Sequence, residues 1–329
     1  MKPASRISIC LALMIVAGFA RAQVPPGLDG TLIVLNKGGN DASFVDLASG
    51  EVVATLPTGI NPHELIVTAD GRWAIGTDYT GGNSLTVFDV ANLSVARTID
   101  LSDHPAPHGI LLMPDQERVI VTTEGSSEVV IVDFLSGDID LAIDTNQPGS
   151  HMVAMSLDGA LAVTANTAGN SVSVIDVEAG QTLRVLEVPP QPEAIGANPE
   201  VFDVWVGSNA AGTVSLIDLE DGSIRRQLAG FSWPYRILFT RDQRFVVIPD
   251  PRRQVLRVFD AASGEERGRL AFSGGAPQGV TLHPDDRTLF LSLSGEDKIA
   301  VVDIEGMQVL GEYEVGSRPD GIGYSALTR

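Results

Sequence analysis

The stretch HMVAMSLDGALAVTANTAGNSVSVIDVEAGQTLRVLEV, residues 151–188, decides the fold because it contains one complete unit of a repeat. It divides into four short apolar runs, HMVAMS, ALAVTAN, SVSVID and QTLRVLEV, separated by the turn-forming segments LDG, TAGN and VEAG. Runs of this length, bounded by glycine, aspartate and asparagine, are typical of β-strands. The stretch therefore predicts four strands joined by turns.

The same unit recurs seven times along the chain of 329 residues. Successive copies open 45, 43, 42, 42, 43 and 42 residues apart, and the opening positions are His63, His108, His151, Glu193, Tyr235, Gln278 and Asp320. A period of this size, with several short strands in each unit, is the signature of a β-propeller.

The third run of every unit ends in aspartate, whose carboxylate can accept hydrogen bonds from backbone amides of the following turn. These residues, which we interpret as structural, are Asp46, Asp89, Asp133, Asp176, Asp218, Asp260 and Asp303.

The two ends of the chain complete one unit between them. The C-terminal PDGIGYS, residues 319–325, supplies a first strand without successors, and residues 30–56 supply three strands without a first strand. Joining them closes the ring and removes two exposed sheet edges. We therefore expect an all-β, seven-bladed β-propeller in a single domain over residues 23–329, with blade seven closed by the N- and C-terminal strands.

Two stretches, VTANTAGNSVSVIDVEAG (163–180) and VGSNAAGTVSLIDLEDG (206–222), resemble the YVTN repeat of the YncE-like seven-bladed propellers. The resemblance extends over residues 30–325, although the tyrosine of the family motif is mostly missing. It implies the propeller fold. Relatives with this or a similar propeller include lactone hydrolases, amine dehydrogenase heavy chains, nitrous oxide reductase and binding proteins without a known reaction, so function has to be argued from the site.

The N-terminus has the succession of a secretory signal peptide. Lys2 and Arg6 form a positive region, residues 7–19 are apolar, and the small residues of Ala20–Ala22 precede a cleavage point. The apolar stretch is too short to span a bilayer as a helix. We expect residues 1–22 to be removed and the mature protein, without a membrane span, to be periplasmic or secreted.

Cleavage changes the formal net charge from −20 to −23, because the three basic residues Lys2, Arg6 and Arg21 are lost. Such a charge repels phosphate backbones and argues against a nucleic-acid partner. The single cysteine, Cys10, leaves with the signal, so the mature chain has no disulfide. We expect a monomer whose partner is a small-molecule ligand or substrate.

Three of the five histidines, His63, His108 and His151, open adjacent units. The first strand of each blade lines the channel of a propeller, so these imidazoles are expected to converge at the channel mouth. Three imidazoles with an open fourth position suit catalytic zinc, and imidazole also suits copper and iron. The pattern predicts a divalent metal ion (Zn, Cu or Fe), assisted by Glu193 or Asp320. The alternative is that each imidazole bonds a carbonyl of a neighbouring blade and stiffens the channel wall.

The loops after the second strands reach the same face of the propeller. Their matched positions are assigned to Asn36, Asp78, Glu124, Asn166, Asn209, Asp250 and Ser294. Glu124, followed by Asp78, is the candidate general base, because a carboxylate near a metal-bound water can accept its proton. The alternative is a pair of solvated loop acids.

The opposite side of the mouth carries FSWPYR, residues 231–236. Trp233, Tyr235 and Arg236, with Gln278, are the candidate ligand-binding residues, since they offer an aromatic wall and a fixed cation to an anionic or planar ligand. The alternative for Trp233 is packing between blades five and six.

The sequence lacks a GxSxG nucleophile elbow, an HExxH helix and a phosphate-binding glycine-rich loop, which argues against a serine hydrolase or a nucleotide enzyme. Two hypotheses remain open. The first is a metal-dependent hydrolase or lyase acting on a small organic substrate of lactone or glycoside type. The second is a non-catalytic binding or scaffold propeller of the cell envelope, or an accessory to a periplasmic redox system.

Export is tested by the N-terminus of the protein recovered from a cell-envelope fraction. Intact-mass and peptide mass spectrometry are expected to find a chain that begins near Gln23, because the charged, apolar and small-residue regions precede that position. Recovery of the chain with residues 1–22 still attached would contradict the expectation.

Overall fold

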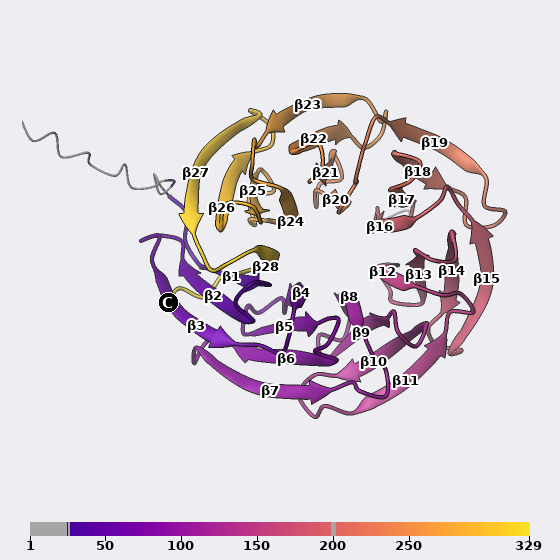
Figure 1. Cartoon of the computed structure of the whole chain (residues 1–329), viewed down its shortest axis with the longest axis horizontal. Helices are drawn as coiled ribbons and strands as arrows, with labels where there is room; N and C mark the ends of the chain where they lie inside the picture. The colour runs from indigo at the N-terminus through magenta and orange to yellow at the C-terminus, as the bar shows by residue number, and fades with distance from the viewer. Residues whose placement is uncertain (1–24, 26, 199–201) are drawn as a thin grey trace, which may run out of the picture.

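The computed structural model describes residues 25, 27–198 and 202–329, so the predicted signal peptide lies outside the described residues. Over the described part of the chain, the strands form seven four-stranded antiparallel sheets, arranged as blades around a central axis (Figure 1). No helix able to cross a membrane occurs within these residues. The prediction of an all-β, seven-bladed propeller is confirmed.

Each blade places its four strands in order from the axis outward. The inner strands are β4 (Pro62–Val67), β8 (Pro107–Leu112), β12 (Ser150–Met155), β16 (Pro192–Ala197), β20 (Leu238–Phe239), β24 (Pro277–Leu282) and β28 (Pro319–Ser325). The second strands are β1 (Thr31–Asn36), β5 (Trp73–Asp78), β9 (Arg118–Thr123), β13 (Leu161–Asn166), β17 (Val204–Ser208), β21 (Phe245–Asp250) and β25 (Thr288–Leu293).

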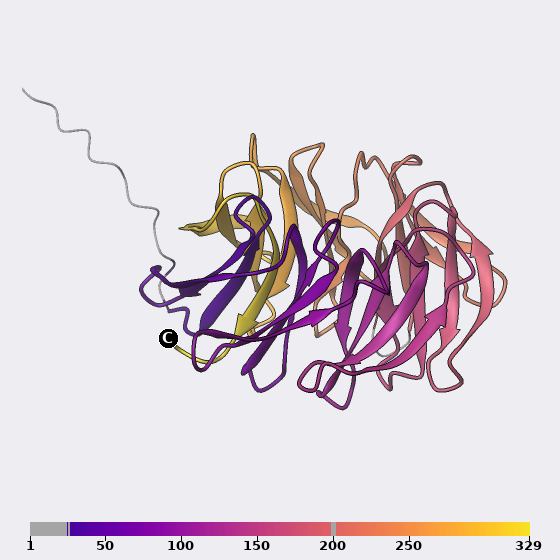
Figure 2. The same ribbon diagram turned by 60° about the horizontal axis from the view of Figure 1, so that its bottom comes forward.

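The third strands are β2 (Asp41–Asp46), β6 (Ser84–Asp89), β10 (Glu128–Asp133), β14 (Ser171–Asp176), β18 (Thr213–Ile217), β22 (Val255–Asp260) and β26 (Lys298–Asp303). The outer strands are β3 (Val52–Pro57), β7 (Ser94–Asp100), β11 (Ile139–Asp144), β15 (Gln181–Glu187), β19 (Ile224–Ala229), β23 (Glu266–Ala271) and β27 (Gln308–Glu314). Figure 2 shows that the connecting loops emerge on two opposite faces of the ring.

Blade seven combines both ends of the chain, as predicted. Its strand order is β28-β1-β2-β3, and β28 pairs antiparallel with β1, with Thr31 opposite Ser325 and Ile33 opposite Gly323. The yellow strand β28 therefore lies beside the indigo strand β1 in Figure 1. The pairing ties the C-terminal strand to the first blade strand of the chain and closes the ring.

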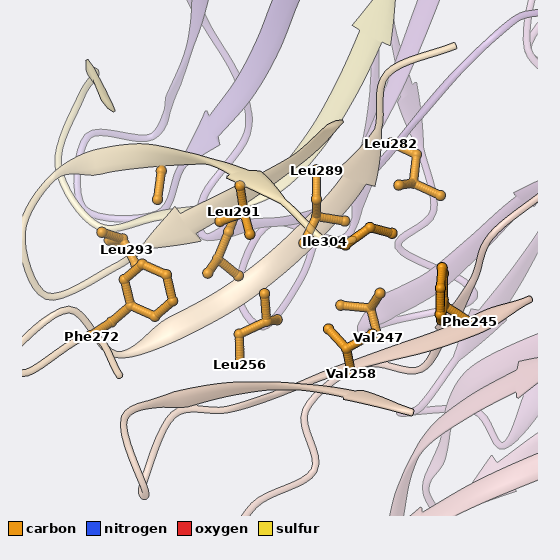
Figure 3. Packing of buried hydrophobic residues seen from close by; sticks show 12 residues of the cluster. Phe245, Val247, Leu256, Val258, Phe272, Leu282, Leu289, Leu291, Leu293 and Ile304 are labelled. Atoms are coloured by element: carbon orange, nitrogen blue, oxygen red, sulfur yellow. The ribbon is translucent and has the colours of Figure 1, made fainter. Parts of the chain in front are cut away.

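The hydrophobic core lies between neighbouring blades. In one cluster, Val247 and Val258 of blade five pack against Leu289 and Leu291 of blade six, and all four side chains are buried (Figure 3). Second strands are buried on both faces because each lies between two such clusters, as the fully buried strand β1 illustrates.

The seven turn aspartates have the predicted structural role. The Asp133 carboxylate accepts the amides of Leu135 at 2.9 Å and Ser136 at 2.8 Å. Equivalent bonds to an amide two or three residues later are made by Asp46, Asp89, Asp176, Asp218, Asp260 and Asp303.

Blade five departs from the repeat at its inner strand, which contains only the two residues of β20. Pro249 lies in the neighbouring strand β21 and has no amide hydrogen to donate to the inner strand. The Tyr235 amide donates to the Pro249 carbonyl at 3.0 Å, but the ladder pairs of β20 are limited to Leu238 with Val247 and Phe239 with Val246. The segment before β20 is therefore irregular, and it carries the aromatic and cationic residues singled out in the sequence.

Candidate functional site

The mouth of the channel is built by one hydrogen bond that recurs in six blades. Two positions before its opening residue, each of these blades has a residue with a left-handed backbone, namely Asn61, Ala106, Gly149, Gln191, Ala276 or Arg318. The carbonyl of that residue accepts, at 2.8 to 3.3 Å, the amide of the residue that directly follows the second strand: Tyr79, Glu124, Thr167, Asn209, Ser294 or Lys37.

Two sets of side chains result. The opening ring contains the first-strand residues His63, His108, His151, Glu193, Tyr235, Gln278 and Asp320. The loop ring contains the residues after the second strands, Lys37, Tyr79, Glu124, Thr167, Asn209, Pro251 and Ser294.

The assignment of Asp78 to the mouth is wrong by one position. Asp78 is the last residue of β5, is fully buried, and accepts hydrogen bonds from Ser84 at 2.7 Å and Thr86 at 2.8 Å. Burial raises its pKa. Asp78 thus belongs to the interior of blade one, and its neighbour Tyr79 is the residue that reaches the loop ring.

Lys37 and Tyr79 are site residues that the sequence reasoning missed. A signal for Tyr79 existed, because Tyr79 and Glu124 each lie 16 residues after the opening residue of their own blade. The assigned position Asp78 lies only 15 residues after His63. A constant offset would have aligned Glu124 with Tyr79 and not with Asp78.

The three predicted histidines are brought together, as expected, but two of them stack. The ring centroids of His108 and His151 are 3.6 Å apart, with an angle of 28° between the planes. His63 lies 5.0 Å from His108, and the Tyr79 ring stands edge-on to His108 at 4.7 Å. His108 is 2% exposed, and burial holds its pKa well below the ordinary histidine value.

This stack does not fit one metal ion bound by three imidazoles. The nitrogen lone pair lies in the plane of its ring, so an ion in the plane of His151 lies outside the nearly parallel plane of His108. Within residues 25, 27–198 and 202–329, no group of three or more His, Cys, Asp or Glu side chains is arranged to hold a metal. His108 Nδ1 is buried without a hydrogen-bond partner. The Zn, Cu or Fe ion remains a prediction from the sequence.

His151 lies between two carboxylates from the neighbouring blades. Its Nδ1 is 3.0 Å from Glu124 Oε2, which also accepts a hydrogen bond from the Tyr79 hydroxyl. On the other side, its Nε2 is 4.0 Å from Glu193 Oε1. Glu193 Oε2 accepts from Trp233 Nε1 at 2.9 Å, so this indole faces the mouth and its polar edge is satisfied there.

The pKa values of Glu124 and Glu193 are shifted in opposite directions. Burial would raise the pKa of Glu124, but hydrogen bonds from His151 and Tyr79 outweigh it and lower the pKa. Burial of Glu193 dominates and raises its pKa, although His151 and Trp233 oppose the shift. Carboxyl groups whose environments separate their pKa values in this way are suited to different acid–base roles.

The rest of the opening ring is held by a buried polar cluster. Asp320, which is fully buried, lies 2.8 Å from Lys37 Nζ and accepts from the Tyr235 hydroxyl at 2.9 Å. Lys37 also donates to Gln278 at 3.2 Å. Burial would raise the pKa of Asp320, but the positive charge of Lys37 and the nearby His63 lower it.

Arg236 does not face a ligand at the mouth, contrary to expectation. It is 7% exposed, lies one residue below the opening ring, and pairs with Glu64 of blade one. Its guanidinium stacks on Tyr235 at 4.1 Å, and burial lowers its pKa to about 10. The irregular backbone before β20 turns this side chain across the channel and not toward the histidines.

Comparison with known proteins supports the fold and leaves the family open. No family model matches the chain. A functionally unknown protein from Desulfotomaculum acetoxidans is similar in structure, with a TM-score of 0.75 at 15% identity, over 90% of this chain and 99% of that one. Hydrazine synthase from Kuenenia stuttgartiensis has a TM-score of 0.64 at 17% identity, over 88% and 98%. At these identities the likeness concerns the fold alone.

One local sequence match was found among curated proteins. The chain is 33% identical over 75 residues to a dihydro-heme d1 dehydrogenase from Pseudomonas aeruginosa. The match covers 23% of this chain and spans only 15% of the length of that protein.

Because His63 is largely buried, we expect the protein to lose free energy of unfolding as the pH falls. Burial is the main cause that lowers the pKa of His63 to about 4; Lys37 and Arg236 add to the shift and Asp320 opposes it. Because the unfolded chain binds the proton near pH 6.5, stability is complete above that pH and is lost as pH falls toward 4. This group alone should lower the free energy of unfolding by about 2 kcal/mol between pH 7 and pH 5.

Urea unfolding at pH 7, 6 and 5 measures this dependence. The variant His63→Phe keeps an aromatic ring against Tyr79 and His108 but cannot take up a proton. Between pH 7 and pH 5, the variant should therefore lose about 2 kcal/mol less free energy of unfolding than the unmodified protein. Parallel profiles for the two proteins would show that His63 is not the source.

Proposed function

We propose that the protein is an exported, YncE-like propeller that binds a small organic molecule at the channel mouth and transfers protons to and from it through His151. The supporting observation is the position of His151 between Glu124, whose pKa is lowered, and Glu193, whose pKa is raised. The side chain of His151 is 13% exposed and that of Glu124 27%, so both can be approached from solvent.

In the proposed proton path, Glu124 orients the base. As a carboxylate, Glu124 accepts a hydrogen bond from His151 Nδ1–H, which fixes the tautomer and leaves the Nε2 lone pair available. Nε2 then removes a proton from a water molecule or from the substrate. Glu193, which stays protonated to higher pH, donates a proton to the leaving oxygen.

This scheme supports two reaction classes. With water as the nucleophile it gives hydrolysis of a lactone or glycoside, and with a substrate C–H as the proton donor it gives an elimination. In both, one proton is taken by His151 and one is released by Glu193, and exchange with solvent restores the starting state. No metal ion is needed, and none enters any step.

The residues of the scheme are tested by turnover. Purified protein is assayed at neutral pH with a panel of dihydrocoumarin, δ-valerolactone and p-nitrophenyl glycosides. For any substrate that is turned over, His151→Asn should reduce kcat by about 100-fold or more, because the proton acceptor is lost. Glu124→Gln should reduce it less, since the imidazole remains but loses its orienting carboxylate.

The matched control is His104→Asn, which removes a second histidine bonded to a glutamate, at 2.8 Å from Glu128 and outside the opening ring. It should leave kcat unchanged. The imidazole tautomers, measured by nitrogen NMR, provide a readout that needs no substrate. A His151 that carries its proton on Nε2 would rule out the proposed base, whatever the panel shows.

A second candidate is binding of a tetrapyrrole beside a periplasmic redox system. It is favoured by the 75-residue likeness to a dihydro-heme d1 dehydrogenase and by the partly exposed aromatic residues Tyr79 and Trp233, which suit a planar ligand. Titration with protohaem should then give a saturable absorption change that is weakened about tenfold in Trp233→Ala. This candidate would be contradicted if protohaem binding did not saturate, or if His104→Asn weakened it as much as Trp233→Ala.

A further inference from the structure

Below the opening ring, the channel contains a cavity of about 400 Å³. Every one of the seven blades contributes to its wall through the inner strand or the segment next to it. About half of the exposed wall is apolar, with Ile66, Leu111, Ile195, Leu238, Val280 and Ile322 among the lining residues. Cavities of this size that combine apolar side chains with a few polar groups are typical of small-molecule sites.

The ion pair of Glu64 and Arg236 lies at the upper end of the cavity. Both side chains are largely buried, 13% and 9% exposed, and both line the cavity. Next to them the inner strands approach one another closely. A Cβ atom on Gly109 would lie 2.8 Å from Met152 Cα, and one on Gly321 would lie 2.5 Å from the His63 carbonyl oxygen. The ion pair therefore lies between the opening ring and the aliphatic residues of the cavity wall.

The lower end opens on the face opposite the mouth. Arg241, in the turn after β20, is exposed and lines the cavity there. Its guanidinium donates to the His283 carbonyl at 3.3 Å, and no carboxylate of the described residues pairs with it. A second hollow of about 280 Å³ shares Leu111, Ile195, Leu238 and Arg241 with the first. The open volume thus continues along the rim on which Arg241 lies.

The charges of the lining residues favour an anion. Glu64 and Arg236 neutralise one another, which leaves Arg241 as the uncompensated charge of the cavity wall. The chain as a whole has a formal net charge of −20. The Asp286 carboxylate accepts the backbone amides of Arg241 and Asp242 at 2.8 and 2.7 Å, so the rim itself is not positive. The Arg241 guanidinium, which lines the cavity without a carboxylate partner among the described residues, is the contact at which a ligand with one negative group and an apolar body is least repelled.

We propose that the lower channel is a second binding site, for a small amphipathic anion. Its apolar body occupies the aliphatic cavity, and its carboxylate or sulfonate lies at Arg241. The ligand enters from the face opposite the histidines, and the Glu64–Arg236 pair limits how deeply it can reach. This site does not depend on the chemistry proposed for the mouth.

The test uses fluorescence of anilinonaphthalene sulfonate, a probe with an aromatic body and one anionic group. The unmodified protein should bind it saturably, and octanoate should displace it. Octan-1-ol has the same chain without the charge and should compete about three- to tenfold more weakly, as expected for one exposed ionic contact.

Variants locate the probe. Leu238→Trp and Val280→Trp add bulk to the cavity from two different blades, and each should abolish displaceable binding. Arg241→Gln should remove the preference for octanoate over octan-1-ol. The matched control is Arg184→Gln, because Arg184 is also exposed and also donates to a carbonyl, that of Leu219 at 2.9 Å, but lies on the outer strand β15.

Circular dichroism establishes that each variant is folded. Because there are two tryptophan variants, the test can still be made if one of them does not fold. Binding that survives in a folded Leu238→Trp or Val280→Trp protein would overturn the proposal, as would an equal effect of Arg184→Gln and Arg241→Gln. Binding should persist in His151→Asn. Loss of probe binding in His151→Asn would assign the probe to the mouth and would also overturn the proposal. If no substrate is turned over at the mouth, the probe-binding test of the lower channel still stands.

Discussion

The hydrogen bond from the loop ring to the residue two positions before the opening ring is the interaction on which the site depends. It joins the end of the second strand to the start of the first strand at the same height in six blades. Blade five cannot make it, because the equivalent loop residue is Pro251, which has no amide hydrogen. There the segment before β20 leaves the ladder. Trp233 and Tyr235 can then reach Glu193 and Asp320 across the mouth.

The same irregularity explains how a buried ion pair comes to lie on the axis. Moving two charges out of water is costly and is offset only by close geometry and further hydrogen bonds. Arg236 meets this requirement: it pairs with Glu64, donates to the Tyr235 carbonyl at 2.6 Å and stacks on the Tyr235 ring. The pair joins blades one and five, and it lies between the polar opening ring and the cavity below.

The fold could be predicted from the sequence because a repeat of seven copies leaves little freedom. The turn aspartates, the opening ring and the closure by β28 follow from spacing alone. Side-chain direction could not be predicted in the same way. Whether His108 and His151 stack or converge depends on their rotamers, and Tyr79 packs edge-on against His108. The course of the segment that carries Arg236 depends on Pro249 and Pro251, which deviate from the repeat. The cavity below the ion pair has no sequence motif, since its aliphatic wall looks like any inner strand.

The split between Glu124 and Glu193 follows from their places in the two rings. Glu124 belongs to the loop ring of blade two, where its side chain is 27% exposed and accepts from two donors. Glu193 belongs to the opening ring of blade four, where it is 13% exposed and desolvation prevails. His151 opens blade three and therefore lies between them. The propeller thus creates unlike carboxylates from one repeat by presenting them at different depths. Adjacent blades bring them to the same imidazole, which is the arrangement that general acid–base chemistry requires.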